Sequence, residues 1–163
     1  MNTRSPFILQ WAGPLPALKT ELLDHGWMAP AAWTFPASLE WLSPQANPAS
    51  LPVLPRLNGG YPERLVLIRT GGFMPANQRL VLRVWRSDVT VSDGTKSVPL
   101  WIGTVTLEQI RTMESLVAFA TRVPGVGASL YMLSKALPSA QMVQRQPLAT
   151  ELPGQRLVLL GRP

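Results

Sequence analysis

The chain contains no cysteine and a single histidine, His25, among its 163 residues. Without cysteine it can form neither disulfide bonds nor thiolate metal ligands, and one imidazole is too few for a histidine-based metal site. We therefore expect no metal. The compartment in which the protein works is not indicated by cysteine usage, because there is none to oxidise.

Long hydrophobic runs are also missing. The longest apolar stretches, such as Leu65–Ile68 and Leu157–Leu160, are far shorter than the roughly 20 residues that a membrane-spanning helix requires. The first residues lack the apolar segment of a signal peptide. With 163 residues and 46% apolar content, the sequence predicts one soluble domain, residues 1–163, with enough apolar side chains for a core.

Catalytic motifs are absent as well. The sequence has no Gly-x-Ser-x-Gly elbow, phosphate loop or dinucleotide fingerprint, so we expect no cofactor. His25 precedes Gly26 at the end of a predicted helix, where an imidazolium interacts favourably with the helix dipole. Asp88 and Asp93 are candidates for a carboxylate pair, but a turn explains Asp93 and no base lies near them in sequence. The sequence therefore does not favour an enzyme.

Positive charge is what the chain does have. Fifteen basic residues, twelve of them arginine, stand against nine acidic ones, which gives a net charge of +6. Six arginines lie between Arg56 and Arg86, with Glu63 as the only acidic residue. This excess either attracts an anionic partner or reflects arginine as the preferred surface cation. Nucleic acid is not favoured, because the aromatic residues lack the paired pattern of an RNA-recognition motif.

The pattern of the first hundred residues predicts one helix and several strands. Leucines at helical spacing predict a helix over Pro16–His25, with Gly26 as its C-terminal cap. The proline-rich stretch that follows predicts extended packing pinned by tryptophans, with a helical turn near Ser38–Leu42. Beyond it we expect three features: antiparallel strands over Leu65–Arg69 and Arg79–Arg86, and a hairpin in which Val89–Ser92 and Thr95–Val98 flank an Asp93-Gly94 turn.

In the last third, Thr106 and Gln109 resemble a capping box, and Ile110, Met113 and Val117 follow at helical spacing, which predicts a helix that stops at Pro124. A short helix is expected around Leu130, Leu133 and Leu137. Two strands close the chain, Ala140–Arg145 and Gln155–Leu160, joined by a Pro147–Gly154 loop. The predicted fold is α+β: an antiparallel sheet of five or six strands covered by two or three helices.

Period-two alternation divides the strand Arg79–Arg86 into two faces. Leu80, Leu82 and Val84 form the face that we expect in the core. The other face presents Arg83 beside Trp85, which is either an anion-binding surface or an arginine stem packed on a tryptophan. The candidate anion-binding surface comprises Arg56, Arg69, Arg83, Trp85 and Trp101.

Five segments in order suggest a family. They are Leu9–Leu15, His25–Trp27, Leu51–Pro55, Leu82–Trp85 and Pro99–Gly103. Together they resemble the LssY C-terminal domain, a tail found behind the membrane portions of bacterial DedA-like and PAP2-type phosphatase-like proteins and named for a type I secretion component. The resemblance covers about residues 10–103. Members often carry histidines where this chain has Asn58 and Gln78 or Arg79, so no histidine-based function is expected here.

The resemblance implies a setting: the cytoplasmic face of a bacterial inner membrane, with any phosphatase chemistry in a membrane portion. We expect a non-catalytic accessory domain that binds an anionic lipid head group, or a partner segment such as that membrane portion, through its arginine-rich sheet. A purely structural or regulatory domain without a ligand is the alternative, and a minor hydrolase that uses unrecognised carboxylates is a third.

Overall fold

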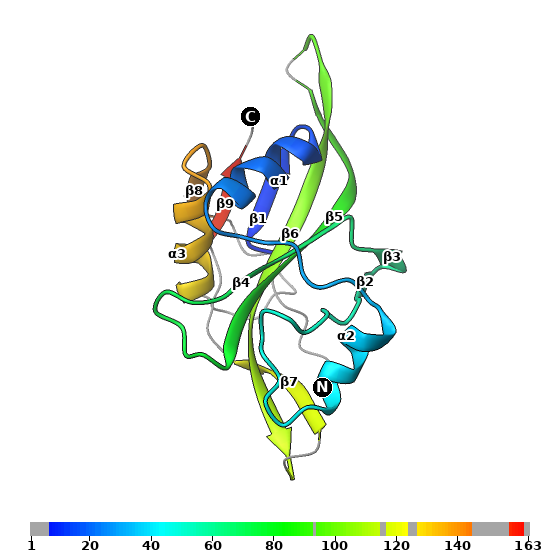
Figure 1. Cartoon of the computed structure of the whole chain (residues 1–163). Coiled ribbons are helices and arrows are strands. Elements are labelled where there is room, and N and C mark those ends of the chain that lie inside the picture. The colour runs from blue at the N-terminus through cyan, green and yellow to red at the C-terminus, as the bar shows by residue number, and fades with distance from the viewer. Residues whose placement is uncertain (1–6, 93, 115–116, 124–126, 145–156, 162–163) are drawn as a thin grey trace, which may run out of the picture.

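The computed structural model describes residues 7–92, 94–114, 117–123, 127–144 and 157–161 (Figure 1). In chain order the elements are β1 (Leu9–Ala12), α1 (Leu15–Asp24), α2 (Phe35–Leu39), the 3₁₀-helix η1 (Glu40–Leu42), β2 (Leu57–Asn58), β3 (Tyr61–Pro62), β4 (Leu65–Arg69), β5 (Gln78–Ser92), β6 (Ser97–Met113), β7 (Val117–Val123), α3 (Gly127–Ala136), β8 (Gln141–Gln144) and β9 (Leu157–Gly161).

One sheet organises the described part of the chain. Its strands follow the order β4-β5-β6-β1-β9-β8, and β7 also pairs with β6. β6 is the central strand: one edge pairs with β5, and the other pairs first with β1 and then with β7. All of these pairs are antiparallel except β1 with β9. Figure 1 shows β5 and β6 running the length of the molecule, so they determine where the other elements lie.

Helices α1 and α3 cover one face of the sheet. Leu18 and Leu22 of α1 and Leu133 of α3 are fully buried, in one cluster with the apolar face of β5. The predicted core residues Leu80, Leu82 and Val84 belong to this cluster, which confirms the expected strand faces. α1 also matches its predicted position. It ends before Gly26, whose φ of +87° is a conformation that glycine adopts without strain.

The opposite face is covered by residues 43–56, which we call the strap. Leu51 of the strap is buried against Ile110 and Ala118, and Val53 against Ile68 and Val81. The predicted tryptophan contacts are present. Trp33 Nε1 donates to the carbonyl oxygen of Val53 at 2.9 Å, and the ring of Trp41 packs beside Leu51. The sheet is therefore buried on both faces.

The fold class is α+β with a predominantly antiparallel sheet, as predicted, although the helices are few and short. The described residues form a seven-stranded sheet rather than one of five or six strands, and a separate two-stranded β2–β3 sheet. The predicted hairpin is confirmed. Its register pairs Ser92 with Ser97, so the paired strands end before the predicted two-residue turn. Asp93 itself lies outside the described residues.

The helix predicted from Thr106 onward is wrong. β6 continues through this segment to Met113, and the chain returns as β7. The segment is a strand because every second side chain is buried on the same face of the sheet. Those on the strap side are Thr104, Thr106, Glu108 and Ile110. Backbone partners on both edges satisfy the β6 amides, and this tertiary pairing overrides a local capping pattern.

The end of the chain follows the prediction more closely. The expected short helix is α3, and the two expected strands are β8 and β9, which pair antiparallel. The Pro147–Gly154 loop between them lies outside the described residues. β9 pairs in parallel with β1, and the backbone of Gly161 lies so close to Trp11 that an added Cβ would be 2.5 Å from its ring. Glycine is therefore required at this position, where β9 pairs with β1.

We expect Leu82→Ala to lower the free energy of unfolding by ~2–5 kcal/mol, because it leaves a cavity between the sheet and the helices. Urea unfolding measures this loss. Leu42→Ala, at an exposed leucine, serves as the control and should change stability by less than about 1 kcal/mol. Equal effects of the two substitutions would contradict the assignment of this core.

Candidate functional site

Of the five residues expected to form one anion-binding surface, four lie on the sheet, two on each face, and Arg56 lies in the strap. Arg83 opposes Val66 and Trp85 opposes Ile102, which places both on the strap side. Arg69 opposes Leu80 and Trp101 opposes Arg86, which places both on the helix side. Trp85 and Trp101 therefore do not share a surface, because neighbouring positions along a strand point to opposite faces.

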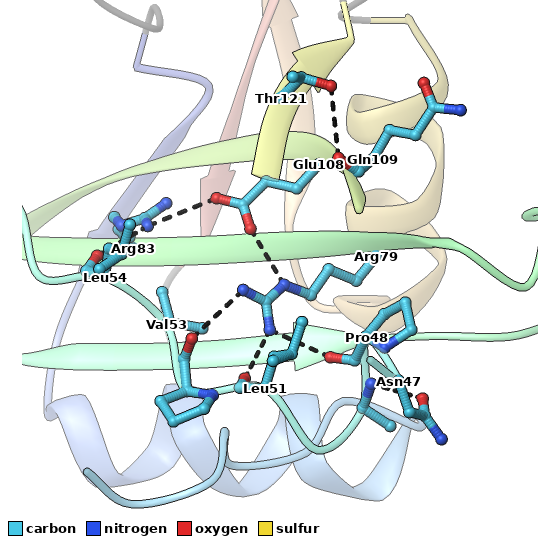
Figure 2. A network of polar contacts seen from close by, with 12 residues as sticks. Asn47, Pro48, Leu51, Val53, Leu54, Arg79, Arg83, Glu108, Gln109 and Thr121 are labelled. Carbon is cyan, nitrogen blue, oxygen red and sulfur yellow. Dashed lines mark hydrogen bonds and ion pairs between the residues drawn. The ribbon is translucent and has the colours of Figure 1, made fainter. Parts of the chain in front are cut away.

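On the strap side, the polar side chains of β5 are buried. Arg79 and Arg83 each expose only 1% of their surface. Arg79 Nε donates to Glu108 Oε2 at 3.0 Å, and its Nη1 donates to the carbonyl oxygens of Pro48 and Leu51 at 3.0 and 2.6 Å. Figure 2 shows this guanidinium between β6 and the strap. Arg79 also lies 5.9 Å from the centre of the Trp41 ring. Arg79 thus fastens the strap to the sheet.

Arg83 continues the same network with poorer geometry. Its Nη2 donates to the carbonyl oxygen of Leu54 at 3.1 Å and lies 3.7 Å from Glu108 Oε1. Its Nε lies 3.3 Å from Glu63 Oε1, an ion pair without hydrogen-bond geometry, and its Nη1 has no hydrogen-bond partner among the described residues. Burial lowers the pKa of Arg83, and Glu108 opposes that shift. Arginine nevertheless stays charged at neutral pH.

Three other predicted residues, Arg69, Trp101 and Arg56, make separate contacts. Arg69 Nη1 donates to the carbonyl oxygen of His25 at 2.7 Å, so its charge lies at the C-terminus of α1, where the helix dipole favours a cation. Trp101 Nε1 donates to the carbonyl oxygen of Gly13 at 2.8 Å. Arg56 is exposed, and its backbone N–H donates to Glu63 Oε1 at 2.6 Å. None of the five shares an open surface with all the others.

These contacts assign Arg79 and Arg83 to the packing of the strap. Arg83 and Trp85 are both buried on the strap side rather than beneath a helix, and Trp85 has Phe7 packed edge-on at 6.1 Å between ring centres. His25 also behaves as expected of a cap residue. It follows the last residue of α1, and its Nδ1 lies 2.7 Å from the carbonyl oxygen of Glu21.

An open cleft lies elsewhere, between β3 and the point where β5 leaves the body of the sheet. Its volume is about 520 Å³. The residues that line it are Tyr61, Pro62, Arg64, Arg86, Ser87, Asp88 and Thr90. Arg64 and Arg86 are exposed, and neither guanidinium makes a hydrogen bond or ion pair with another residue that the structure describes. The cleft therefore holds two arginines whose donors face solvent.

A break in strand pairing shapes one wall of this cleft. The register of β5 against β6 shifts between Arg86 and Thr90, so Ser87, Asp88 and Val89 bulge out opposite Leu100. Ser87 Oγ stabilises the bulge by donating to the carbonyl oxygen of Leu100 at 2.9 Å and accepting from the backbone N–H of Val89 at 3.2 Å. Bulges of this kind re-aim side chains and are frequent beside binding sites.

Arg64 and Arg86 belong to the arginine-rich stretch between Arg56 and Arg86 but were not among the predicted site residues. A usable signal was present for Arg86. It is the first charged residue on the apolar face of β5, after Leu80, Leu82 and Val84, and it therefore marks where the core ends. Arg64 precedes β4 and carries no comparable signal. Only the tertiary fold brings it to the same cleft.

The described residues give no sign of metal chemistry or of a membrane-spanning helix. They contain no group of three or more His, Cys, Asp or Glu side chains arranged to hold a metal ion. No helix among them is long and apolar enough to cross a membrane. Among the described residues that line the cleft, Asp88 is the only acidic one.

We expect Glu108→Gln to lower the free energy of unfolding by ~3–5 kcal/mol, because it leaves two buried guanidiniums without their shared counter-charge. Urea unfolding gives the value. Glu114→Gln removes an exposed carboxylate just beyond the same strand and should change stability by no more than about 0.5 kcal/mol. A loss below about 1 kcal/mol for Glu108→Gln would show that the network does not hold the strap.

Comparison with known proteins adds one assignment. A family model described as the LssY C-terminus matches residues 2–119, which include the strap, the Arg79–Glu108 pair and the cleft. No curated protein and no solved structure matches the chain. The matched region is more than half of the chain, as the resemblance of its ordered segments predicted. This chain therefore belongs to the LssY C-terminal family.

Proposed function

We propose that this chain is a non-catalytic accessory domain of a bacterial inner-membrane protein and that it binds an anionic lipid head group in the cleft that contains Arg64 and Arg86. The observation that carries the proposal is the pair of guanidiniums that line one cleft without a partner among the described residues. In this proposal the domain lies at the cytoplasmic face of the membrane, beside the membrane portion of its parent protein and its lipids.

The chemistry of the cleft suits a phosphate group. A guanidinium presents several N–H donors in a planar fork that matches two phosphate oxygens. Arg64 and Arg86 supply two such forks, and the hydroxyl groups of Tyr61 and Thr90 add neutral donors. Asp88 brings one negative charge, which leaves the lining with a net charge of +1. The volume of about 520 Å³ lies within the ~300–1,000 Å³ of small-molecule sites.

The charge of the whole chain supports the same partner. Its net charge of +6 attracts an anionic surface over distances of about one Debye length, ~8 Å at 0.15 M salt. Such a binding site gives weak recruitment by itself, because each basic residue near an anionic surface contributes only ~1 kcal/mol. Tethering to a membrane portion would make weak binding sufficient, since it raises the effective concentration of the domain at the bilayer.

The structural alternative applies to a different part of the molecule. Arg79 and Arg83 are buried under the strap and Trp85 is buried with Phe7 against it, which favours a packing role for all three. Hydrolysis has little support, because Asp88 is the single carboxylate among the described residues that line the cleft, and these residues include no histidine or lysine that would act as its partner base.

We expect Arg64→Gln combined with Arg86→Gln to weaken binding to vesicles that contain phosphatidylglycerol by about 30-fold, the equivalent of ~2 kcal/mol for two basic residues. Co-sedimentation at two salt concentrations measures it, and the unmodified chain should bind less at high salt. Vesicles of phosphatidylcholine alone should bind neither form.

The control is Lys19→Gln combined with Arg111→Gln, which removes two exposed charges outside the cleft. If the charge of the cleft itself matters, this control should lose much less binding than the cleft variant. Equal losses of vesicle binding in the two variants would show that binding depends on the net charge of the chain and not on the cleft. Equal binding of the unmodified chain to neutral and anionic vesicles would refute head-group binding and favour a structural domain.

A further inference from the structure

The β2–β3 hairpin projects from the body of the domain and forms a sheet of its own. Asn58 pairs with Tyr61 and Leu57 with Pro62 across a Gly59-Gly60 turn. Both turn glycines have positive φ, +56° and +87°, the combination of a type I′ turn, and no atom lies within 4 Å of the position of an added Cβ at either. Figure 1 shows the hairpin at the edge of the molecule. Its tip is therefore narrow and open to solvent.

The hairpin carries large apolar side chains that the fold does not bury. Leu57 exposes 69% of its surface and Tyr61 exposes 67%. Leu54, just before the hairpin, is also exposed. A two-stranded hairpin without a hydrophobic face packed against other elements is only marginally stable in water. Exposure of these side chains therefore does not help the fold, and it indicates contact with another apolar surface.

The position of the hairpin beside the cleft identifies that surface. Tyr61 and Pro62 belong to the hairpin and also line the cleft with Arg64 and Arg86. The exposed Tyr61 thus lies beside two unpartnered cations, and Leu57 lies across the hairpin from Pro62, which also lines the cleft. An anionic bilayer presents the matching layers, phosphate groups outside and hydrocarbon below, and tyrosine is favoured at their boundary because its ring is apolar and its hydroxyl is polar.

We propose that the β2–β3 hairpin inserts Leu57 and Tyr61 into the interface of an anionic bilayer while Arg64 and Arg86 bind the lipid phosphates. This inference depends on the proposed function, to which it adds the depth and orientation of binding. The glycine tip enters between head groups with no side chain of its own. The cleft then faces the membrane, with the strap and the buried arginine network held above it.

The test begins with Leu57→Ser combined with Tyr61→Ser. Binding to phosphatidylglycerol vesicles should fall by roughly tenfold or more, because the apolar contact is lost while both arginines remain. Phe73→Ser is the matched control: Phe73 is 96% exposed in the connection between β4 and β5, and it does not line the cleft. This control should bind like the unmodified chain. Thermal unfolding verifies that each variant is folded.

Insertion itself can be observed with a fluorescent probe, because a chain without cysteine allows one label at one chosen position. An NBD group on Leu57→Cys should shift to the blue on adding phosphatidylglycerol vesicles and should be quenched by lipids brominated along their acyl chains. The same label on Phe73→Cys should show neither change. Equal behaviour of the two labels would overturn the insertion model.

Glycerol phosphate, a soluble head-group analogue, separates this inference from the proposed function. In an NMR titration it should shift the signals of Arg64 and Arg86 equally in the unmodified chain and in a Leu57→Ser variant, because Leu57 does not line the cleft. Leu57→Ser alone should still weaken binding to phosphatidylglycerol vesicles. If that variant also keeps full vesicle binding, insertion is wrong and head-group binding survives. If neither glycerol phosphate nor anionic vesicles bind, both are wrong. If the unmodified chain self-associates and the variant does not, the insertion model is wrong, and the hairpin contacts a second copy of the chain instead of a bilayer.

Discussion

The buried ion pair between Arg79 and Glu108 is the interaction on which the rest of the structure depends. The strap is rich in proline, which has no N–H, so the strap cannot satisfy its carbonyl groups by joining the sheet as a regular strand. Arg79 provides the missing donors to the carbonyls of Pro48 and Leu51, and Glu108 balances its charge. An irregular segment can thereby cover one face of the sheet, while helices cover the other.

This use of arginine also decides where charge is available for binding. Arg79 and Arg83 are buried under the strap, and Arg69 caps α1, so half of the arginines between Arg56 and Arg86 are occupied with the fold. Arg64 and Arg86 lie where β4 begins and where β5 bulges away from β6, and their guanidiniums stay in solvent. The proposed binding site and the proposed insertion hairpin meet at this boundary between the packed sheet and its projecting hairpins.

Local patterns predicted much of the fold. Leucines at helical spacing before Gly26 identified α1, and alternation identified both faces of β5, because these patterns reflect burial that each element requires wherever it packs. The segment after Thr106 was predicted as a helix and is a strand. Its capping pattern is a local signal of about 1 kcal/mol, whereas pairing with β5 on one edge and β7 on the other satisfies the whole backbone of β6.

The sequence by itself determined the fold class, the family, the absence of cysteine chemistry and the concentration of arginine between Arg56 and Arg86. Only the tertiary structure decided which of these arginines are buried. An arginine on a strand face has the same local pattern whether water or a strap covers it, and the strap lies about thirty residues earlier in the chain than the side chains it covers, as the contact of Arg79 with Pro48 shows. The cleft likewise brings Tyr61, Arg64 and Arg86 together through a strand register and a bulge. Local sequence patterns predict neither of these, because both depend on pairing with a distant strand.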